Sequence, residues 1–166
     1  MLIAVASDIH DNIWNLDRAL ADIRGRKAEA LLFLGDFCAP FTLAQMAEGF
    51  AGPVHVVFGN NDGDPLLLAT VARKYAHVTL HGQLAELDLG GRRVALNHYP
   101  QIATRLAESG AYAAVFSGHD HKGMKKTMGK TLWANPGEVM GRFGAPSYGI
   151  YDTGTGAFEH VSIAAR

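Results

Sequence analysis

Five short polar motifs punctuate this chain, and each begins where a run of hydrophobic residues stops. In chain order they are Asp8-Ile9-His10, Gly35-Asp36, Gly59-Asn60-Asn61-Asp62, Asn97-His98 and Gly118-His119-Asp120-His121. In sheets of parallel strands, ligands and chemistry gather beyond the carboxyl ends of the strands, where the loops converge. The pattern therefore predicts an α/β fold in which these motifs sit at the ends of buried strands.

The first half of the chain alternates short apolar runs with segments of helical periodicity. Apolar runs of this length, partly β-branched, are typical of buried parallel strands. We predict strands at residues 2–7, 30–34 and 54–58. We predict helices at residues 12–24, at residues 42–48 with Thr42 as cap, and from Pro65 to about Tyr75 with Asp64 as N-cap.

The second half contains mostly strands. Residues 84–89 and 93–97 flank Gly90-Gly91, which is typical of a two-residue hairpin turn. We predict a helix at residues 102–108 and further strands at residues 113–117, 131–134, 148–152 and 158–163. The sequence contains no internal repeat or linker, so the simplest architecture is one compact α/β domain, residues 1–166, with two sheets.

Composition and charge argue against a nucleic-acid-binding protein. Of the 166 residues, 48% are hydrophobic and 19% are charged, as in an ordinary globular domain. The net charge is -1, and the nearest approach to a basic patch is the set Lys122, Lys125, Lys126 and Lys130. We interpret these lysines as a solvated loop and expect no stable nucleic-acid binding.

Other sequence features concern location. Cys38 is the single cysteine and cannot form an internal disulfide, which is typical of a reducing cytoplasm. No apolar run reaches the roughly 18 to 20 residues that a membrane span needs, so we expect no membrane insertion. The apolar start of the chain lacks a preceding basic region and is interpreted as a buried strand rather than a signal peptide. We therefore predict a cytoplasmic protein.

The motifs together supply two carboxylates, one amide and four imidazoles. Taken singly, an Asp after a strand is most often a turn former or helix cap, and a lone His is usually structural. Seven such side chains at matching strand ends instead favour a centre for two divalent metal ions; they are Asp8, His10, Asp36, Asn60, His98, His119 and His121. We expect Mn²⁺, with iron, nickel, zinc or cobalt as alternatives, because the set mixes nitrogen and oxygen ligands and contains no thiolate.

The residue spacing predicts how the ligands are arranged. In an extended strand end, residues two apart point to the same side. Asp8 and His10 are therefore expected to chelate one ion, and His119 with His121 to repeat that geometry. Seven ligands exceed what one ion with open positions can accept, so Asp36 is the natural candidate for a bridge between two ions.

The set Asp8-x-His10, Gly35-Asp36, Gly59-Asn60-x-Asp62, His98 and Gly118-His119-x-His121 resembles the calcineurin-like metallophosphoesterase superfamily. The small size and the Asn135-Pro136-Gly137 turn narrow the resemblance to the single-domain bacterial and archaeal phosphodiesterases of that superfamily. The resemblance implies a four-layer α/β/β/α sandwich of two mixed sheets flanked by helices. It also implies that one metal is held by Asp8, His10 and His121 and the other by Asn60, His98 and His119, with Asp36 as the bridge.

The same resemblance implies hydrolysis of a small phosphate ester, most often a diester, by a hydroxide that bridges the metals. It gives catalytic roles to Asn60, Asn61 and Asp62. Many members carry histidine where this chain has Asn61; an amide cannot deliver a proton, so we expect a preference for good leaving groups. On the substrate side we expect Tyr99 and Asn12, although Asn12 equally suits the cap of the following helix.

Several neighbours of the motifs receive plainer interpretations. Glu138 stands where serine often follows the Asn-Pro-Gly turn; it could narrow or acidify the rim of the pocket, but we interpret it as an exposed turn residue. Cys38 is interpreted as a small buried hydrophobe rather than a neighbour of the metals. Trp14 and Trp133 are interpreted as packing residues rather than as a base-stacking platform.

Alternative functions use the same residues differently. A phosphomonoesterase acting on nucleotides or small metabolites would need the same metal centre. An interaction scaffold, such as the retromer cargo-recognition subunit that shares the fold, has a degraded metal site, whereas all seven expected ligands are present here. A metal-binding regulatory or storage module is a third alternative. Met140 and Phe143 are the residues we would place in the interface of a homo-oligomer.

Overall fold

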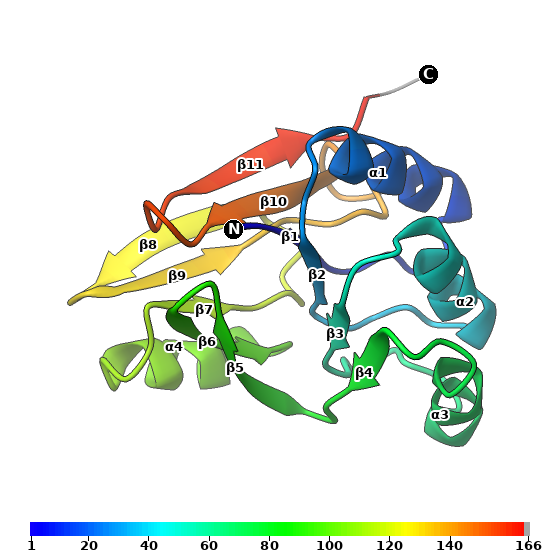
Figure 1. Ribbon diagram of the computed structural model, residues 1–166, viewed down its shortest axis with the longest axis horizontal. Helices are drawn as coiled ribbons and strands as arrows, with labels where there is room; N and C mark the ends of the chain where they lie inside the picture. The colour runs from blue at the N-terminus through cyan, green and yellow to red at the C-terminus, as the bar shows by residue number, and fades with distance from the viewer. Residues whose placement is uncertain (165–166) are drawn as a thin grey trace.

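Two sheets lie face to face, and helices cover the outer side of each (Figure 1). The computed structural model describes residues 1–164. The first sheet consists, in spatial order, of β11 (Phe158–Ser162), β10 (Ser147–Asp152), β1 (Leu2–Ala6), β2 (Ala30–Phe33), β3 (Val54–Val56) and β4 (Val78–Leu80). The second consists of β5 (Leu84–Leu89), β6 (Arg92–Asn97), β7 (Ala114–Phe116), β9 (Thr131–Asn135) and β8 (Met124–Met128).

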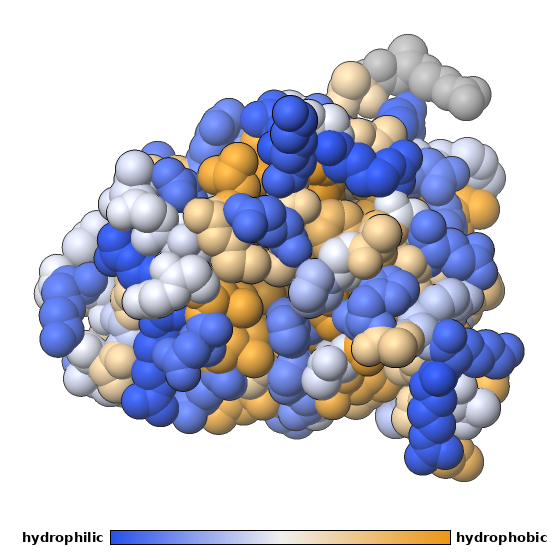
Figure 2. Space-filling model, in the orientation of Figure 1, coloured by the Kyte–Doolittle hydropathy of each residue, from blue (hydrophilic) through white to orange (hydrophobic). Residues whose placement is uncertain are grey.

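Three helices cover the first sheet and one covers the second. Figure 1 shows α1 (Ile13–Gly25), α2 (Pro40–Gly49) and α3 (Pro65–Ala72) together on one side of the molecule. Helix α4 (Pro100–Glu108) lies against the second sheet, in contact with β6, β7 and β9. In the orientation of Figure 1, the surface of the molecule exposes apolar residues between hydrophilic ones (Figure 2). No helix within residues 1–164 is long and apolar enough to cross a membrane.

The alternation of side chains along the strands produces three separate cores. Ala4 and Ala6 of β1 belong to the core beneath α1 and α2, whereas Ile3 and Val5 belong to the core between the two sheets. A third, smaller core joins α4 to the second sheet. Three cores separate four layers, so the predicted four-layer α/β/β/α sandwich is confirmed.

The strand directions place the polar motifs. Strands β1, β2, β3 and β4 pair in parallel, and so do β6, β7 and β9. Four of the five motifs follow β1, β2, β3 and β7, and the fifth, Asn97-His98, begins at the last residue of β6. The predicted hairpin at Gly90-Gly91 is also confirmed, because both glycines have positive φ, 54° and 76°, as a turn of this kind requires.

Three sequence-based predictions of local structure were wrong or incomplete. Thr42 does not cap α2: the helix begins at Pro40, and Asp11 Oδ1 accepts from Ala39 N–H at 2.9 Å and from the Thr42 hydroxyl at 2.6 Å. The start of α2 is thus held by a carboxylate from a distant loop, which helix-start patterns do not reveal. Strands β4 and β8 were not predicted. Because β8 is a mostly exposed edge strand, MKKTM, its lysines resembled a solvated loop.

Candidate metal centre

The loops after β1 and β2 continue the pairing of these strands and so fix the first ligands. Asp8 N–H donates to Gly35 O at 3.1 Å, and the N–H groups of Ile9 and His10 donate to Asp36 O at 3.1 Å. The two carboxylates end up buried side by side, with 0% of Asp8 and 1% of Asp36 exposed. Backbone hydrogen bonding therefore keeps the two acidic loops close together.

The ligand-bearing loops are not extended, which corrects the geometry predicted from the spacing. Five predicted ligands have positive φ: 56° at Asp8, 44° at His10, 64° at Asp36, 72° at His119 and 58° at His121. A left-handed backbone at a non-glycine residue costs about 1 to 3 kcal/mol and tends to occur at functional sites. The surrounding loops impose this conformation, and it turns each side chain back over the strand ends.

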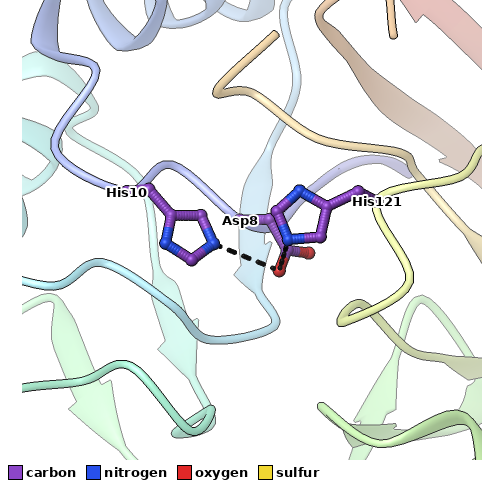
Figure 3. A group of neighbouring side chains, drawn as sticks. All are labelled: Asp8, His10 and His121. Atoms are coloured by element: carbon purple, nitrogen blue, oxygen red, sulfur yellow. Dashed lines mark ion pairs between the residues drawn. The ribbon is translucent and has the colours of Figure 1, made fainter. Parts of the chain in front are cut away.

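Asp8 lies between two imidazoles from different parts of the chain (Figure 3). Its Oδ1 is 3.8 Å from His10 Nε2 and 3.5 Å from His121 Nε2. The two rings stack at 5.1 Å between centroids. The three ligand atoms lie within 4.8 Å of one another, which is compact enough for one cation.

Asp36 connects this group to a second one. Its Oδ2 is 3.4 Å from His10 Nε2, and its Oδ1 is 3.5 Å from the Nε2 of His98. Asp8, Asp36 and His98, all buried, also offer ligand atoms within 4.8 Å of one another. The position of Asp36 between His10 and His98 is the one that a bridging carboxylate would take.

Asn60 and His119 lie beside His98. Asn60 Oδ1 is 3.1 Å from His98 Nε2 and 2.9 Å from His119 Nδ1. The His98 and His119 rings meet edge to face at 5.1 Å. All seven predicted ligands are thus brought together, although His119 belongs to neither of the two groups described above.

Several buried atoms in this cluster make no hydrogen bond or face another acceptor. Within residues 1–164, Asp8 Oδ1 and His10 Nε2 are buried without a hydrogen bond. His98 Nδ1 lies 2.7 Å from Leu34 O, and a carbonyl oxygen can only accept, so the hydrogen of the neutral ring is on Nδ1. His98 Nε2 then carries a lone pair, which faces the oxygens of Asn60 and Asp36. Buried acceptors that face one another are costly unless a cation lies among them. The residues therefore fit a metal site.

Neighbouring groups shift the pKa values of both Asp8 and His10, which lie at the centre of the cluster. Burial alone would raise the pKa of Asp8, but His10 and Ser7, together with the imidazoles of His98 and His121, lower it below its ordinary value. The pKa of His10 is raised, chiefly by Asp8. Asp8 therefore stays ionised at neutral pH, as a metal ligand must be.

Glycines leave room for the carboxylates. A Cβ at Gly59 would collide with Asp36 Oδ1, and a Cβ at Gly118 would collide with Ser7 Oγ and lie 2.7 Å from Asp8 Oδ2. The loops after β3 and β7 could not approach the two carboxylates this closely with any other residue. Each of these glycines directly precedes a predicted ligand, Asn60 or His119.

Asn61 and Asp62 make hydrogen bonds that hold Asp36 and the loops after β2 and β3 in place. The backbone N–H and the side-chain Nδ2 of Asn61 donate to the two oxygens of Asp36, each at 2.8 Å. Asp62 accepts from the backbone N–H groups of Asp36, Phe37 and Gly59 at 3.1, 2.6 and 2.7 Å. The carboxylate of Asp62 thus ties the β2 and β3 loops together; a direct catalytic role for it stays a prediction.

The predicted substrate residues differ in their surroundings. Asn12 caps α1, since its Oδ1 accepts from Asn15 N–H at 3.1 Å, and its Nδ2 donates to Met140 O at 2.8 Å. The capping alternative is confirmed, and substrate contact by Asn12 stays a prediction. Tyr99 lies at the site, with its ring 5.2 Å from that of His98 and 5.4 Å from that of His119.

Sequence interpretation failed for Cys38 and Glu138. Cys38 is only half-buried, and its Sγ lies 3.4 Å from His10 Nδ1, so it does neighbour a ligand. Burial raises the pKa of its thiol to about 11, which keeps it protonated at neutral pH. Glu138 is not an exposed turn residue: it is 1% exposed, and its Oε2 lies 2.6 Å from His121 Nδ1. Neither contact has a local sequence signal, because the partners are 28 and 17 residues away.

A cavity of about 400 Å³ adjoins the loop that carries His119 and His121. It lies between the start of α4 and strands β8 and β9, and is lined by Pro100, Ser117, Asp120, Lys122, Met124, Lys126, Trp133 and Asn135. Trp133 packs as predicted, and its Nε1 donates to Ser117 Oγ at 3.0 Å. Part of the lysine set thus surrounds a pocket beside the site.

Comparison with known proteins identifies the family. Residues 1–156 match the family described as the calcineurin-like phosphoesterase superfamily domain. The chain belongs to this family. A curated relative, a phosphodiesterase from Methanocaldococcus jannaschii, is 26% identical over 166 residues, which cover 98% of this chain and 99% of the relative.

Solved structures show the same fold. An archaeal phosphodiesterase superimposes with a TM-score of 0.91 at 23% identity, over 98% of this chain and 99% of the other. The phosphoesterase Yfce from E. coli gives a TM-score of 0.70 at 20% identity, over 99% and 100% of the two chains. Wild-type Vps29 from Entamoeba histolytica, complexed with Zn²⁺, gives 0.70 at 18% identity, over 99% and 100%.

Proposed function

We propose that this protein hydrolyses phosphodiesters at a centre that holds two divalent metal ions. The observation that carries the proposal is the pair of buried carboxylates, Asp8 and Asp36, surrounded by imidazoles and containing acceptor atoms without protein partners. Membership of a phosphoesterase family and the 26% identical phosphodiesterase from Methanocaldococcus jannaschii support the reaction class.

The proposed ligand assignment follows the two side-chain groups. Asp8, His10 and His121 would hold one ion; Asn60, His98 and His119 would hold the other; Asp36 would contact both. A pair of divalent ions in such a centre supplies a hydroxide at neutral pH and neutralises the charge of the phosphoryl oxygens. We expect Mn²⁺, with Fe²⁺, Ni²⁺, Zn²⁺ or Co²⁺ as alternatives, since ligands of both nitrogen and oxygen type suit all of these ions.

The protein's own residues orient the centre rather than deliver protons. Asn61 donates two hydrogen bonds to Asp36 and thereby fixes the plane of that carboxylate. Its amide is occupied by this contact and has no proton to give a leaving alcohol. The reaction should therefore depend strongly on leaving-group pKa, since general acid help is worth about 10²- to 10⁴-fold where it exists. A flat Brønsted plot over a series of aryl and alkyl methyl phosphates would contradict this.

The cavity beside the site favours a diester over a monoester. Lys122, Lys126 and Trp133 line about 400 Å³ next to the loop that carries His119 and His121. A monoester has no second ester arm to place there, whereas a diester gains apolar and cationic contacts. The space thus supports diester hydrolysis over the alternative of a phosphomonoesterase on nucleotides or small metabolites.

The test compares bis(p-nitrophenyl) phosphate with p-nitrophenyl phosphate, using chelated protein reloaded with Mn²⁺. We expect faster turnover of the diester, and loss of turnover in Asp36→Asn but not in the matched control Asp88→Asn, an exposed carboxylate. Faster turnover of the monoester would overturn the diester preference. Stoichiometric metal binding without turnover of either ester would favour the scaffold or storage alternative.

A further inference from the structure

Glu138 is a buried carboxylate with three N–H neighbours. Its Oε2 lies 2.6 Å from His121 Nδ1, and its Oε1 accepts from the backbone N–H groups of Phe143 and Gly144 at 2.6 and 2.8 Å. It is 1% exposed. A buried carboxylate is retained only when it is well hydrogen-bonded. Glu138 therefore joins two parts of the molecule, an imidazole at the metal centre and a loop at its rim.

The first contact fixes the proton of His121. Because an ionised carboxylate can only accept, His121 Nδ1 must carry a hydrogen, and in the neutral ring the lone pair is then on Nε2. Nε2 is the atom that lies 3.5 Å from Asp8 Oδ1, in the group that would hold the first ion. A carboxylate on the far nitrogen of a ligating histidine orients the ring and raises its basicity.

The second contact holds the rim loop, residues 141–145. Its flanks are anchored elsewhere: Met140 N–H donates to Asp8 O at 2.9 Å, and Ser147 N–H donates to Glu138 O at 2.8 Å. Within residues 1–164, the backbone of the rim loop makes no hydrogen bond other than those to Glu138 Oε1. The ring of Phe143 meets His121 edge to face at 5.1 Å, so the held loop lies against the ligand itself.

We propose that Glu138 is a positioning residue that couples metal binding to the conformation of the rim loop. This inference rests on the metal site of the proposed function. When a cation engages His121 Nε2, the ring is fixed, Nδ1–H stays on Glu138, and Oε1 stays in place to hold the loop. By linkage, a loop held in place strengthens metal binding to the same degree. Loss of the carboxylate uncouples the two.

Two variants of Glu138 separate the effect of its charge from that of its length. In Glu138→Gln the amide oxygen can face His121 or the rim loop but not both, because the NH₂ group then opposes another N–H donor. Glu138→Asp retains the charge but is too short to reach both partners. Glu159→Gln, at a carboxylate that is 67% exposed, is the matched control.

The measurements are calorimetric Mn²⁺ affinity of chelated protein and tryptic cleavage after Arg142, an exposed residue in the rim loop. In the wild type and in Glu159→Gln, saturating Mn²⁺ should slow cleavage at Arg142. In Glu138→Gln, affinity should fall about 10- to 100-fold, and Mn²⁺ should no longer protect Arg142 even at saturation. Glu138→Asp should show a smaller loss of both.

Two results would overturn the proposal. One is a folded Glu138→Gln variant with wild-type affinity and protection. The other is wild-type protein in which saturating Mn²⁺ leaves cleavage at Arg142 unchanged, a result that requires no variant to fold. Both measurements are made without substrate, so a protein that shows the coupling but turns over no ester would contradict the proposed function and leave this inference standing.

Discussion

His10 and His121 flank the same carboxylate oxygen at similar distances, yet they are supported in opposite ways. His10 stands on a loop whose backbone is paired with the loop after β2, and its Nδ1 meets only a weak partner, the Cys38 thiol, at 3.4 Å. His121 stands on a loop that is held two and three residues earlier, where His119 N–H donates to Asp8 Oδ2 and Gly118 N–H donates to His98 O, and its Nδ1 meets the Glu138 carboxylate at 2.6 Å. Where sheet pairing already fixes a ligand, no strong side-chain support is needed; where it does not, a buried carboxylate supplies it.

The largest expected effect comes from the residue that the two imidazoles share. Asp8→Asn should lower Mn²⁺ affinity by at least about 100-fold, because it removes the charge between His10 and His121. The chelated variant should be less stable than the chelated wild type at neutral pH, because the neighbours of Asp8 lower its pKa in the folded protein and the ionised carboxylate therefore stabilises the fold. Calorimetry and urea unfolding test both effects. A variant that binds Mn²⁺ normally would show that Asp8 has only a structural role.

The next effect concerns the side-chain support of the His121 loop. Asn135 Nδ2 donates to Gly118 O at 2.8 Å, and Asn135 Oδ1 accepts from Gly137 N–H at 2.9 Å. Asn135→Ala should cost about 1 to 3 kcal/mol of unfolding free energy, because these buried groups lose their partners. It should also weaken Mn²⁺ binding. Urea unfolding is compared with Gln101→Ala, an exposed control; equal stability of the two variants would remove Asn135 from this support.

Removing the Cys38 thiol, the weak partner of His10, tests whether His10 and His121 differ in the support that they need. Cys38→Ala should change Mn²⁺ affinity by less than about 3-fold, since a protonated thiol is a poor hydrogen-bond donor and the His10 loop is held by its backbone. The same calorimetric titration used for Glu138→Gln measures it. A loss as large as that of Glu138→Gln would mean that both imidazoles depend on side-chain support.

The smallest expected effect is on the pH dependence of stability, which should differ between His10, beside a carboxylate, and the pair His55 and His81. His55 Nδ1 lies 3.0 Å from His81 Nε2, and burial lowers the pKa of both below the ordinary 6.5. The unfolded chain therefore binds more protons than the folded one as the pH falls through 6.5, so this pair lowers stability at acid pH and has no effect well above 6.5. For His10, whose pKa Asp8 raises, the sign is reversed. Urea unfolding at pH 5.5 and 7.5 should show a weaker acid loss in His81→Asn than in the wild type; an equal loss would contradict the assignment.

Much of the fold could be predicted from the sequence, because apolar runs and the turn residues that end them are local signals. The strand and helix cores followed from periodicity, and Asp64-Pro65 and Gly90-Gly91 marked a helix start and a turn that the structure confirms. Strand β8 was not predicted because its side chains are mostly exposed, and β4 was not predicted because it is only 3 residues long and its two apolar side chains are only half-buried. A strand of this kind exists because a neighbour offers it hydrogen bonds, which the local sequence does not show.

The sequence alone determined which residues gather at the site, since ligands placed at the ends of parallel strands must converge once the strands pair. Tertiary structure decided how they are held. The left-handed backbone of five predicted ligands, the contact of Asp11 with the start of α2 and the burial of Glu138 each depend on a partner far away in the chain. Local residue patterns report local conformation and burial, whereas the support of a metal ligand comes from whichever segment the folded chain places behind it.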